Sequence, residues 1–398
     1  MLASICGRLC PAPCERACVF YEDGAPIGIR ALERYAADYG QTKGSSSKNG
    51  RDGKKVAIVG SGPTGLTAAA HLAQLGYRVT IFESFKEPGG ALAYGVPGFR
   101  LPRKTLDSQI NLIESLGVEF KANVLVGQTL GLEELWGEGY AAILLALGAG
   151  TPKFLDIPGT SLGGVYYAEE FLMRMSTLEK SGHLSEEDVP FPIGDKVVVI
   201  GGGYAALDSA RAARRLGREV SVVFHRTHLV PTSARGSTSQ GWALGARQDD
   251  MGVRPEERKY AQQEGVKLEP LAGPVEILGD DDHFVRGLKC LRRDFADPHN
   301  SGDWQLIAVP DSEFILEADT VIVAVGHQPN SLIIKKTLSL KINPDGTIFT
   351  NPEDRMTSIP GVFAAGNVAA GPGSVVEAMA EGKKAGEAMD RRLRGLAP

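Results

Sequence analysis

The sequence lacks any run of 18 apolar residues, so it predicts no membrane-spanning helix. Its start also lacks the apolar stretch of a secretory signal, because Arg8 and Glu15 interrupt it. A strong excess of one charge is missing too. The formal net charge of −5 provides no general attraction to nucleic acid. We therefore expect a cytoplasmic protein that neither inserts into a membrane nor binds nucleic acid.

Glycine, by contrast, is abundant, with 49 residues, and two glycine-rich loops each follow an apolar, β-branched run. The first loop is GSGPTG at 60–65, and the second is GGGYAA at 201–206. In a strand–turn–helix unit the first glycine permits the tight turn and the second lets the backbone reach a pyrophosphate. A small third residue lets helix and strand pack closely. A structural α/β unit with accidental glycines is the alternative for each loop, but the two together predict two nucleotide sites.

The residues that follow each loop distinguish the two sites. Glu83 ends a β-rich run 23 residues after Gly60, where a carboxylate accepts hydrogen bonds from ribose hydroxyls and repels a 2′-phosphate. The same count from Gly201 reaches Phe224, and the next two residues are His225 and Arg226. A cation at this place favours a 2′-phosphate. The second site is therefore predicted to prefer a nucleotide that is phosphorylated on its ribose.

Cysteine is scarce and unevenly distributed. Four of the five cysteines lie near the start, separated from one another by three residues, at Cys6, Cys10, Cys14 and Cys18. Pro11 and Pro13 break any continuous helix, so the thiols need not lie along one stripe. In a cytosolic protein such crowding favours soft-metal ligation over disulfides. Iron–sulfur is the favoured group beside two dinucleotide sites, with zinc or free thiols as alternatives. The lone Cys290 is predicted to be packed rather than reactive.

The length of 398 residues suggests two or three domains. We expect an α/β fold with two nucleotide-binding Rossmann-like domains and a small helical segment that carries the cysteines. The predicted parts are the Cys-rich segment at 1–39, a Gly/Ser-rich linker at 40–53, a first nucleotide domain formed by 54–161 and 325–398, and a second at 162–324. Helix patterns cover residues 29–39 and 375–393.

In combination, these segments resemble the β (small) subunit of glutamate synthase and its relatives. Those relatives include the flavin subunit of ferredoxin:NADP transhydrogenases and the N-terminal half of dihydropyrimidine dehydrogenase. The resemblance is carried by the cysteine run, IGIRALER at 27–34, both glycine loops, GGALAYGVPGFRLP at 89–102, and residues 361–391. It implies the layout of the pyridine nucleotide-disulfide reductases. It also implies FAD at the first loop, NADP(H) at the second, and [4Fe-4S] centres in the cysteine region.

The expected site residues follow from the loops and from the resemblance. FAD is expected at Gly60, Gly62, Pro63, Thr64, Gly65, Glu83, Gly90, Leu92, Val124, Gly366, Asn367, Ser374 and Val375. NADP(H) is expected at Gly202, Gly203, Tyr204, Ala205, His225, Arg226 and Gly326. The expected metal ligands are Cys6, Cys10, Cys14 and Cys18. No catalytic acid–base pair is expected, because hydride transfer depends mostly on placing two flat rings.

The sequence departs from the family pattern at several places. Asn367 stands where the family typically has aspartate, His225-Arg226 replaces a pair of arginines, and the connection over 231–252 is longer. The cysteine segment before Cys6 is also short. In the relatives the second cysteine of the run serves a different cluster, so Cys10 either joins the other three in one cluster or shares a second one with a partner. We expect the single cluster, because ligation inside one chain needs no assembly partner.

A flavin takes two electrons as hydride and releases them singly, whereas an iron–sulfur cluster accepts one at a time. No Cys-x-x-Cys lies beside the FAD elements, which argues against the disulfide-reducing flavoenzymes. We expect an FAD-containing NAD(P)H oxidoreductase subunit that passes electrons between NADP(H), FAD and iron–sulfur, to or from other subunits of a redox complex. A freestanding NAD(P)H:acceptor oxidoreductase and a non-catalytic, redox-sensing subunit are the alternatives.

Overall fold

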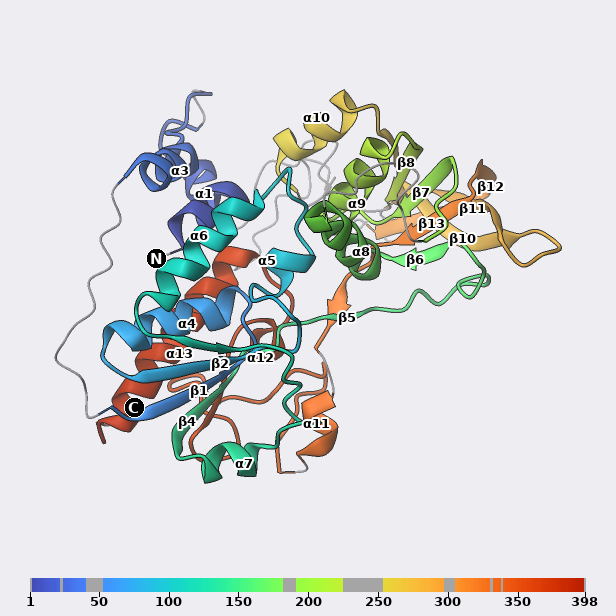
Figure 1. Cartoon of the computed structure of the whole chain (residues 1–398). Helices are drawn as coiled ribbons and strands as arrows, with labels where there is room; N and C mark the ends of the chain where they lie inside the picture. The colour runs from blue at the N-terminus through green and yellow to red at the C-terminus, as the bar shows by residue number, and fades with distance from the viewer. Residues whose placement is uncertain are drawn as a thin grey trace. The chain divides into compact units, whose positions relative to one another are not determined.

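The computed structural model describes residues 2–21, 24–40, 53–181, 191–224, 253–296, 305–329, 332–337 and 339–396. The chain divides into two compact units (Figure 1). Unit 1 comprises Met1–Thr151 and His327–Pro398, and unit 2 comprises Pro152–Gly326. The two connecting segments, β5 (Thr151–Pro152) and β14 (His327–Gln328), pair with each other in a two-stranded sheet. None of the helices in the described ranges is long and apolar enough to cross a membrane.

Unit 1 is built on a parallel sheet with the strand order β15-β4-β1-β2-β3. In chain order its strands are β1 (Lys55–Val59), β2 (Arg78–Phe82), β3 (Glu119–Lys121), β4 (Tyr140–Leu145) and β15 (Val362–Ala364). The central strands are buried on both faces, which explains their continuous apolar runs. Unit 1 therefore has the predicted Rossmann-like form.

Two helices pack tightly against each other on this sheet, α4 (Pro63–Gln74) and α13 (Val375–Leu393). A Cβ added at Gly382 of α13 would lie 2.2 Å from the carbonyl oxygen of Thr64, so the close approach needs glycine. Helix α13 begins with a capping box: Ser374 Oγ accepts from the backbone N of Glu377, whose carboxylate accepts from the backbone N of Ser374. The other helices of unit 1 after residue 54 are α5 (Ala91–Tyr94), α6 (Arg103–Glu114), α7 (Leu132–Gly137), α11 (Leu332–Lys336) and α12 (Asn367–Ala370).

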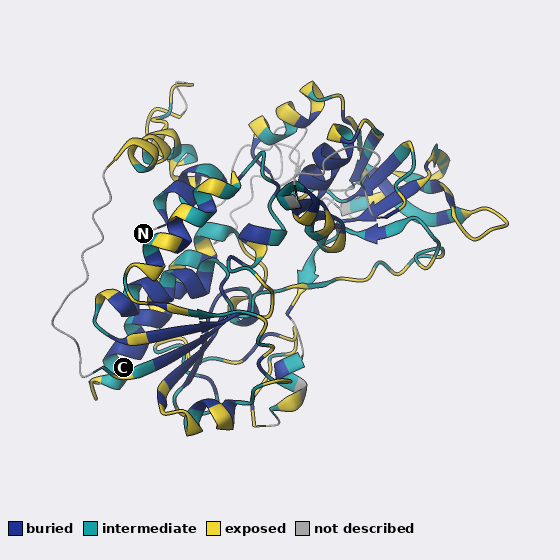
Figure 2. Ribbon diagram, viewed as in Figure 1, coloured by how far each residue is buried: buried dark blue, intermediate teal, exposed yellow. Residues whose placement is uncertain are grey.

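The cysteine segment also belongs to unit 1, with α1 (Ala3–Leu9), α2 (Pro13–Arg16) and α3 (Ile29–Tyr39). Leu2 and Ile5 are buried in the unit 1 core, where α1 contacts α6 and α13. Pro11 lies between α1 and α2 and Pro13 begins α2, so the helix is interrupted as predicted, and α3 has its predicted bounds. In Figure 2, α1 is largely buried, whereas α3 is mostly exposed.

Unit 2 contains a second parallel sheet, in the order β6-β13-β7-β8-β9. In chain order the strands are β6 (Val165–Tyr167), β7 (Lys196–Ile200), β8 (Glu219–Phe224), β9 (Lys267–Pro270) and β13 (Thr320–Val323). Its helices are α8 (Ala168–Ser181), α9 (Tyr204–Arg215) and α10 (Pro255–Gln263). An antiparallel sheet of β10 (Ala272–Gly279), β11 (Val285–Ala296) and β12 (Gln305–Glu317) completes the unit. The second predicted Rossmann-like domain is therefore present.

Candidate cofactor-binding sites

The first glycine loop joins β1 to α4 and leaves open space before the helix. Gly60 has a φ of +103°, and a Cβ there would lie 2.5 Å from the carbonyl oxygen of Ala146. A Cβ at Gly65 would lie 2.0 Å from the carbonyl oxygen of Gly60. A Cβ at Gly62 would meet nothing within 4 Å, and Gly62 caps α4 without a side-chain hydrogen bond. The loop is therefore closely packed at Gly60 and Gly65 and open at Gly62, which fits a pyrophosphate at the N-terminus of α4.

Glu83 follows β2 and is only 4% exposed. Its Oε2 accepts hydrogen bonds from the backbone N of Ser61, at 3.0 Å, and from the Ser61 hydroxyl. Its Oε1 accepts from the backbone N of Phe85, at 3.0 Å, and from the Ser84 hydroxyl, at 3.1 Å. A ribose hydroxyl can replace the exposed Ser84 hydroxyl as a hydrogen-bond donor to the Glu83 carboxylate. Glu83 therefore fits an adenosine ribose.

Two further segments converge on this loop. Gly89 donates its backbone N–H to Ser61 Oγ at 2.8 Å, and a Cβ at Gly90 would lie 3.0 Å from Gly62 Cα. Leu92 is buried in α5, and Val124 donates its backbone N–H to the carbonyl oxygen of Glu83 at 2.8 Å. These contacts bring Gly89 and Gly90 beside the first loop and Val124 beside Glu83.

The C-terminal part of unit 1 returns to the same loop. Gly366 has a φ of +73°, and a Cβ there would lie 2.2 Å from Thr64 Oγ1. Thr64 in turn donates its hydroxyl to the carbonyl oxygen of Ala378 at 3.0 Å. A pocket of about 290 Å³ opens at this place, lined by residues that include Gly366, Asn367 and Glu377. Ser374 and Val375 begin α13. The structure therefore brings Gly366 and helix α13 beside Thr64 of the first loop.

The second loop, between β7 and α9 of unit 2, repeats this local geometry. Gly201 has a φ of +138°, and a Cβ there would lie 2.2 Å from the carbonyl oxygen of Ala324. A Cβ at Gly203 would meet nothing within 4 Å, and Gly203 caps α9 without a side-chain hydrogen bond. Gly202 lies in the loop, Tyr204 and Ala205 begin α9, and Gly326 follows β13 with a φ of +108°. The open helix terminus again fits a pyrophosphate.

The cations predicted to select the 2′-phosphate, His225 and Arg226, lie outside the described residues, as does the long connection over 231–252. The strand that leads to them, β8, ends at Phe224 as the pattern predicted.

The four N-terminal cysteines lie on or beside α1 and α2. Cys6 donates its thiol to Glu33 Oε2 at 3.0 Å, and Cys10 interacts with both Cys6 and Cys14. Burial, and then the Glu33 hydrogen bond, raise the pKa of Cys6, and burial raises that of Cys10. Cys14 is exposed and Cys18 partly buried.

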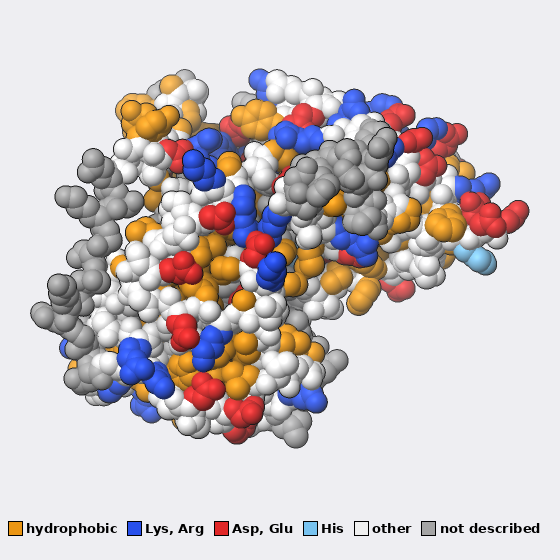
Figure 3. All heavy atoms as spheres, viewed as in Figure 1, with side chains coloured by type: hydrophobic (Ala, Val, Ile, Leu, Met, Phe, Trp, Pro, Cys, Tyr) orange, Lys and Arg blue, Asp and Glu red, His pale blue; other side chains and the backbone are white. Residues whose placement is uncertain are grey.

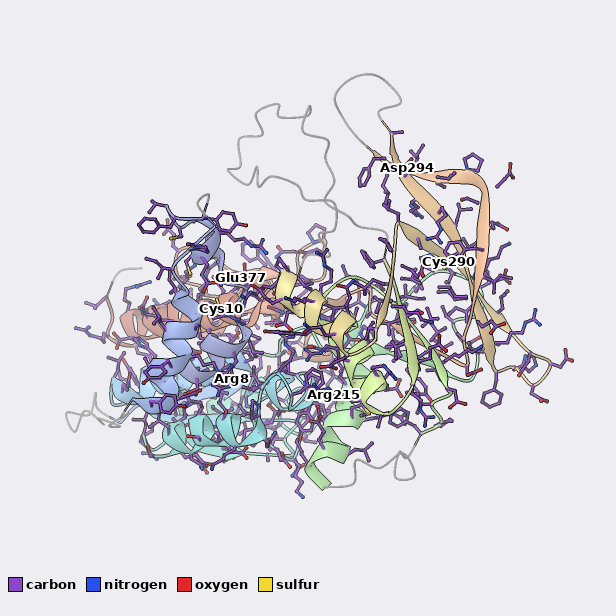
Figure 4. The ribbon with its side chains drawn as sticks, turned by 90° about the horizontal axis from the view of Figure 1, so that it is seen from above. Arg8, Cys10, Arg215, Cys290, Asp294 and Glu377 are labelled. Carbon is purple, nitrogen blue, oxygen red and sulfur yellow. The ribbon has the colours of Figure 1, made fainter. Side chains whose placement is uncertain are left out.

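The donor chemistry of these thiols fits an iron–sulfur cluster. Their arrangement is nevertheless that of free thiols. Within the part of the chain that the structure describes, no three His, Cys, Asp or Glu side chains are gathered to hold a metal ion. The thiols must lose their protons and draw together for ligation. Cys290 is fully buried in the three-stranded sheet (Figure 4), where burial raises the pKa of its thiol to about 12. It is packed, as predicted.

Sequence reasoning missed two residues of these sites. Ser61 is fully buried and links the first loop both to Glu83 and to Gly89. Glu33 holds the Cys6 thiol from a neighbouring helix. The serine between the first two glycines of the loop was a signal for Ser61. Nothing in the local sequence pointed from Glu33 to Cys6, because 27 residues separate them.

Comparison with known proteins agrees with this geometry. The pyridine nucleotide-disulphide oxidoreductase family matches residues 54–382 and also 28–94. The domain described as dihydropyrimidine dehydrogenase domain II, 4Fe-4S cluster, matches residues 1–45. The chain belongs to the pyridine nucleotide-disulphide oxidoreductase family. FAD and NADP(H) are the cofactors that this family implies, and the N-terminal domain is of the type that carries a [4Fe-4S] cluster.

Individual relatives extend over nearly the whole chain. It is 33% identical to the small chain of NADPH glutamate synthase from Mycobacterium tuberculosis, over 98% of this chain and 78% of that one. It is 32% identical to the beta subunit of NADP(+)-dependent formate dehydrogenase from Moorella thermoacetica, over 99% of this chain and 55% of that one. It is also 32% identical to the beta subunit of NADPH-Fe(3+) oxidoreductase from Geobacter sulfurreducens, over 98% of this chain and 58% of that one. The chain thus spans little more than half the length of the last two relatives.

Among solved structures, FprA from Mycobacterium tuberculosis in complex with NADPH has a TM-score of 0.65 and 23% identity, covering 86% of this chain and 85% of that one. Thioredoxin reductase from T. acidophilum has a TM-score of 0.56 and 20% identity, covering 86% and 99%. These similarities confirm the two-domain fold.

Proposed function

We propose that this chain is the FAD-containing NADP(H) oxidoreductase subunit of a redox complex. It moves electrons between NADP(H), FAD and the iron–sulfur centre of its N-terminal segment, to or from a partner subunit. The observation that carries the proposal is the repeated loop geometry: one chain holds two helix N-termini that lack a side-chain cap, with open space at the cap residue, Gly62 or Gly203. A cysteine-rich segment belongs to the same unit as the first of them.

In unit 1 the proposed roles follow from position. The N-terminus of α4 binds the pyrophosphate, because its backbone N–H groups and dipole favour negative charge. Glu83 accepts the adenosine ribose hydroxyls, and the segment from Gly366 to Val375 closes over the ribityl and isoalloxazine end. Asn367 can hydrogen-bond ribityl hydroxyls but carries no negative charge. When bound, FAD supplies exchange between hydride and single-electron chemistry.

In unit 2 we propose that the N-terminus of α9 binds the pyrophosphate of NADP(H), and that Arg226, with His225, binds the 2′-phosphate. A guanidinium can contact a phosphate through two parallel hydrogen bonds. The names of the glutamate synthase, formate dehydrogenase and Fe(3+) oxidoreductase relatives all specify NADP or NADPH, which supports this preference.

The names of those relatives also describe beta subunits or small chains, which supports a partner for this chain. None of the five cysteines forms a disulfide, which supports a reducing, cytoplasmic compartment. The proposal is tested by purifying the chain from its native source under anaerobic conditions and identifying what accompanies it. Stoichiometric FAD and a stoichiometric second polypeptide are expected. FMN in place of FAD contradicts the cofactor assignment, and a chain that purifies alone with full NADPH:acceptor activity indicates the freestanding oxidoreductase.

A further inference from the structure

The first turn of α13 carries a carboxylate of its own. Glu377 is the third residue of this helix, and its Oε2 accepts a hydrogen bond from the backbone N of Ser374 at 2.6 Å. The backbone N of Glu377 donates in return to Ser374 Oγ at 3.3 Å. A helix N-terminus acts as about half a positive charge, which a carboxylate in the first turn opposes. The charge of Glu377 therefore weakens the positive potential at the start of α13.

Glu377, which is labelled in Figure 4, borders the pocket beside the first glycine loop. A Cβ at Gly373 would lie 3.0 Å from Glu377 Oε2 and 3.7 Å from Asn367 Oδ1, so both side chains flank the same turn. The next residue, Ala378, accepts through its carbonyl oxygen from the Thr64 hydroxyl of the loop at 3.0 Å. The carboxylate of Glu377 therefore lies at the space that we propose for the isoalloxazine end of FAD.

The two carboxylates that line this pocket differ in their partners. Glu381 forms ion pairs with Arg355 at 3.1 Å and with Lys384 at 3.2 Å. Figure 3 likewise shows Lys and Arg side chains interspersed with Asp and Glu over the visible face of unit 1. Among the residues that the structure describes, no Lys or Arg forms an ion pair with Glu377, whose carboxylate is bonded to backbone instead. The charge of Glu377 is therefore opposed by the terminus of α13 and not by a cation.

We propose that Glu377 lowers the midpoint potential of the bound flavin. This inference rests on the proposed function. Hydride from NADPH brings two electrons and one proton, so the reduced ring carries one negative charge until a second proton arrives. A carboxylate nearby opposes that charge, and Asn367 supplies none of its own, so Glu377 provides the unpaired negative charge of this pocket. A lower potential makes the reduced flavin a stronger donor to an iron–sulfur centre.

The test is the midpoint potential of the flavin, measured by anaerobic equilibration of the FAD-loaded chain with a reference dye. Glu377→Gln keeps an oxygen that can accept from Ser374 and removes the charge. The equilibrium constant for flavin reduction is expected to rise about three- to tenfold, which is about 15–30 mV for a two-electron couple. The matched control is Glu134→Gln. Glu134 is the third residue of α7, and its Oε2 accepts from the backbone N of Gly131 at 2.6 Å. This control is expected to keep the wild-type potential.

Two further measurements separate the effect of charge from the effect of shape. Adding Asn367→Asp to Glu377→Gln returns a carboxylate to the same pocket, and the potential is expected to recover at least half of the shift. The difference between wild type and Glu377→Gln is also expected to shrink with added salt. The reason is that the Debye length falls from about 10 Å at 0.1 M to about 3 Å at 1 M.

The outcomes distinguish this inference from the proposed function. A wild-type potential in Glu377→Gln, or a double variant that recovers nothing, overturns the inference and leaves the proposed function intact. Loss of FAD from Glu377→Gln, with FAD retained in Glu134→Gln, shows that Glu377 only builds the site and likewise overturns the inference. A wild-type chain that binds no FAD overturns the proposed function itself.

Discussion

The hydroxyl of Ser61 donates a hydrogen bond to the carboxylate of Glu83, and the backbone N–H of Ser61 donates another to the same oxygen at 3.0 Å. The Ser61 oxygen also accepts from Gly89 at 2.8 Å. One buried serine thus joins the phosphate loop, the ribose carboxylate and the segment before α5. The proposed FAD site is held together by a side chain that needs no contact with the cofactor.

Ser61→Ala is expected to weaken FAD binding about tenfold, because Glu83 loses the hydroxyl that orients it and Gly89 loses its acceptor. Ser115→Ala is the control, since the Ser115 hydroxyl bonds only to its own helix, at the carbonyl oxygen of Leu112. The dissociation constant is measured by quenching of FAD fluorescence on adding flavin-free protein. A Ser61→Ala chain that melts at a lower temperature but binds FAD normally would show that Ser61 is merely structural.

Gly62→Ala and Gly65→Ala are expected to separate binding from folding. A methyl at Gly62 enters open space, so the chain folds but the methyl occupies the place of the pyrophosphate, and FAD is lost. A methyl at Gly65 would lie 2.0 Å from a backbone oxygen, so stability falls as well. Melting temperature and bound FAD are measured on both. Full FAD content in Gly62→Ala would place the cofactor elsewhere.

Arg226→Ala is expected to raise the KM for NADPH by about 10–150-fold, because it removes a charge-assisted hydrogen bond that contributes about 1.5–3 kcal/mol. The KM for NADH is expected to change little, since NADH has no 2′-phosphate. Arg286→Ala, at an exposed position of β11, serves as the control. Equal wild-type kcat/KM values for NADPH and NADH argue against the assignment.

Glu264 gives unit 2 a defined acid sensitivity. Burial opposes its ionisation, but hydrogen bonds from Arg215 and Arg211 lower its pKa to about 2 from the model-peptide value of 4.5. Because the pKa is lower in the folded state, this stabilisation is complete above about pH 4.5 and is lost as the pH falls toward 2. Solvent screening reduces the effect because the Glu264 side chain is partly exposed, so Glu264→Gln is expected to cost about 2 kcal/mol at pH 7 and to flatten this part of the acid-unfolding curve. Denaturant unfolding at several pH values measures the free energy of unfolding and its pH dependence. If the variant gives the same curve as the wild type, the hydrogen bonds from Arg211 and Arg215 to Glu264 do not stabilise unit 2.

The sequence predicted what local stereochemistry decides. The loops at 60–65 and 201–206 follow from glycine spacing, and helices α3 and α13 follow from periodicity. The position of Glu83 after β2 could also be predicted, because the spacing of a βαβ unit is regular.

Contacts between distant residues could not be predicted. The fit of Gly366 against Thr64 depends on the return of the chain after unit 2, and the bond from Ser61 to Glu83 depends on the register of β1 beside β2. The pattern of α3 predicts an apolar stripe, but its direction is decided by the polar contacts of Arg8 and Glu33. The roles of His225 and Arg226 stay predictions.

The account also predicts iron and acid-labile sulfide near four per chain, held by Cys6, Cys10, Cys14 and Cys18. Replacing any one of these cysteines by serine is expected to lower the iron content sharply, whereas Cys290→Ser, in the core of unit 2, leaves it unchanged. Elemental analysis of anaerobically purified protein measures this. Zinc in place of iron rules out the iron–sulfur assignment.

The central claim is that NADPH delivers electrons through FAD to an iron–sulfur centre within this one chain. The most direct measurement is anaerobic addition of NADPH to the purified chain, followed by flavin absorbance and by low-temperature EPR of the same samples. We predict rapid flavin bleaching and an EPR signal of a reduced cluster. Both are expected to be lost in Gly203→Ala, because the added methyl group fills the pyrophosphate site of unit 2. A flavin that NADPH does not bleach, or a bleached flavin beside an iron–sulfur centre that gives no signal, contradicts it.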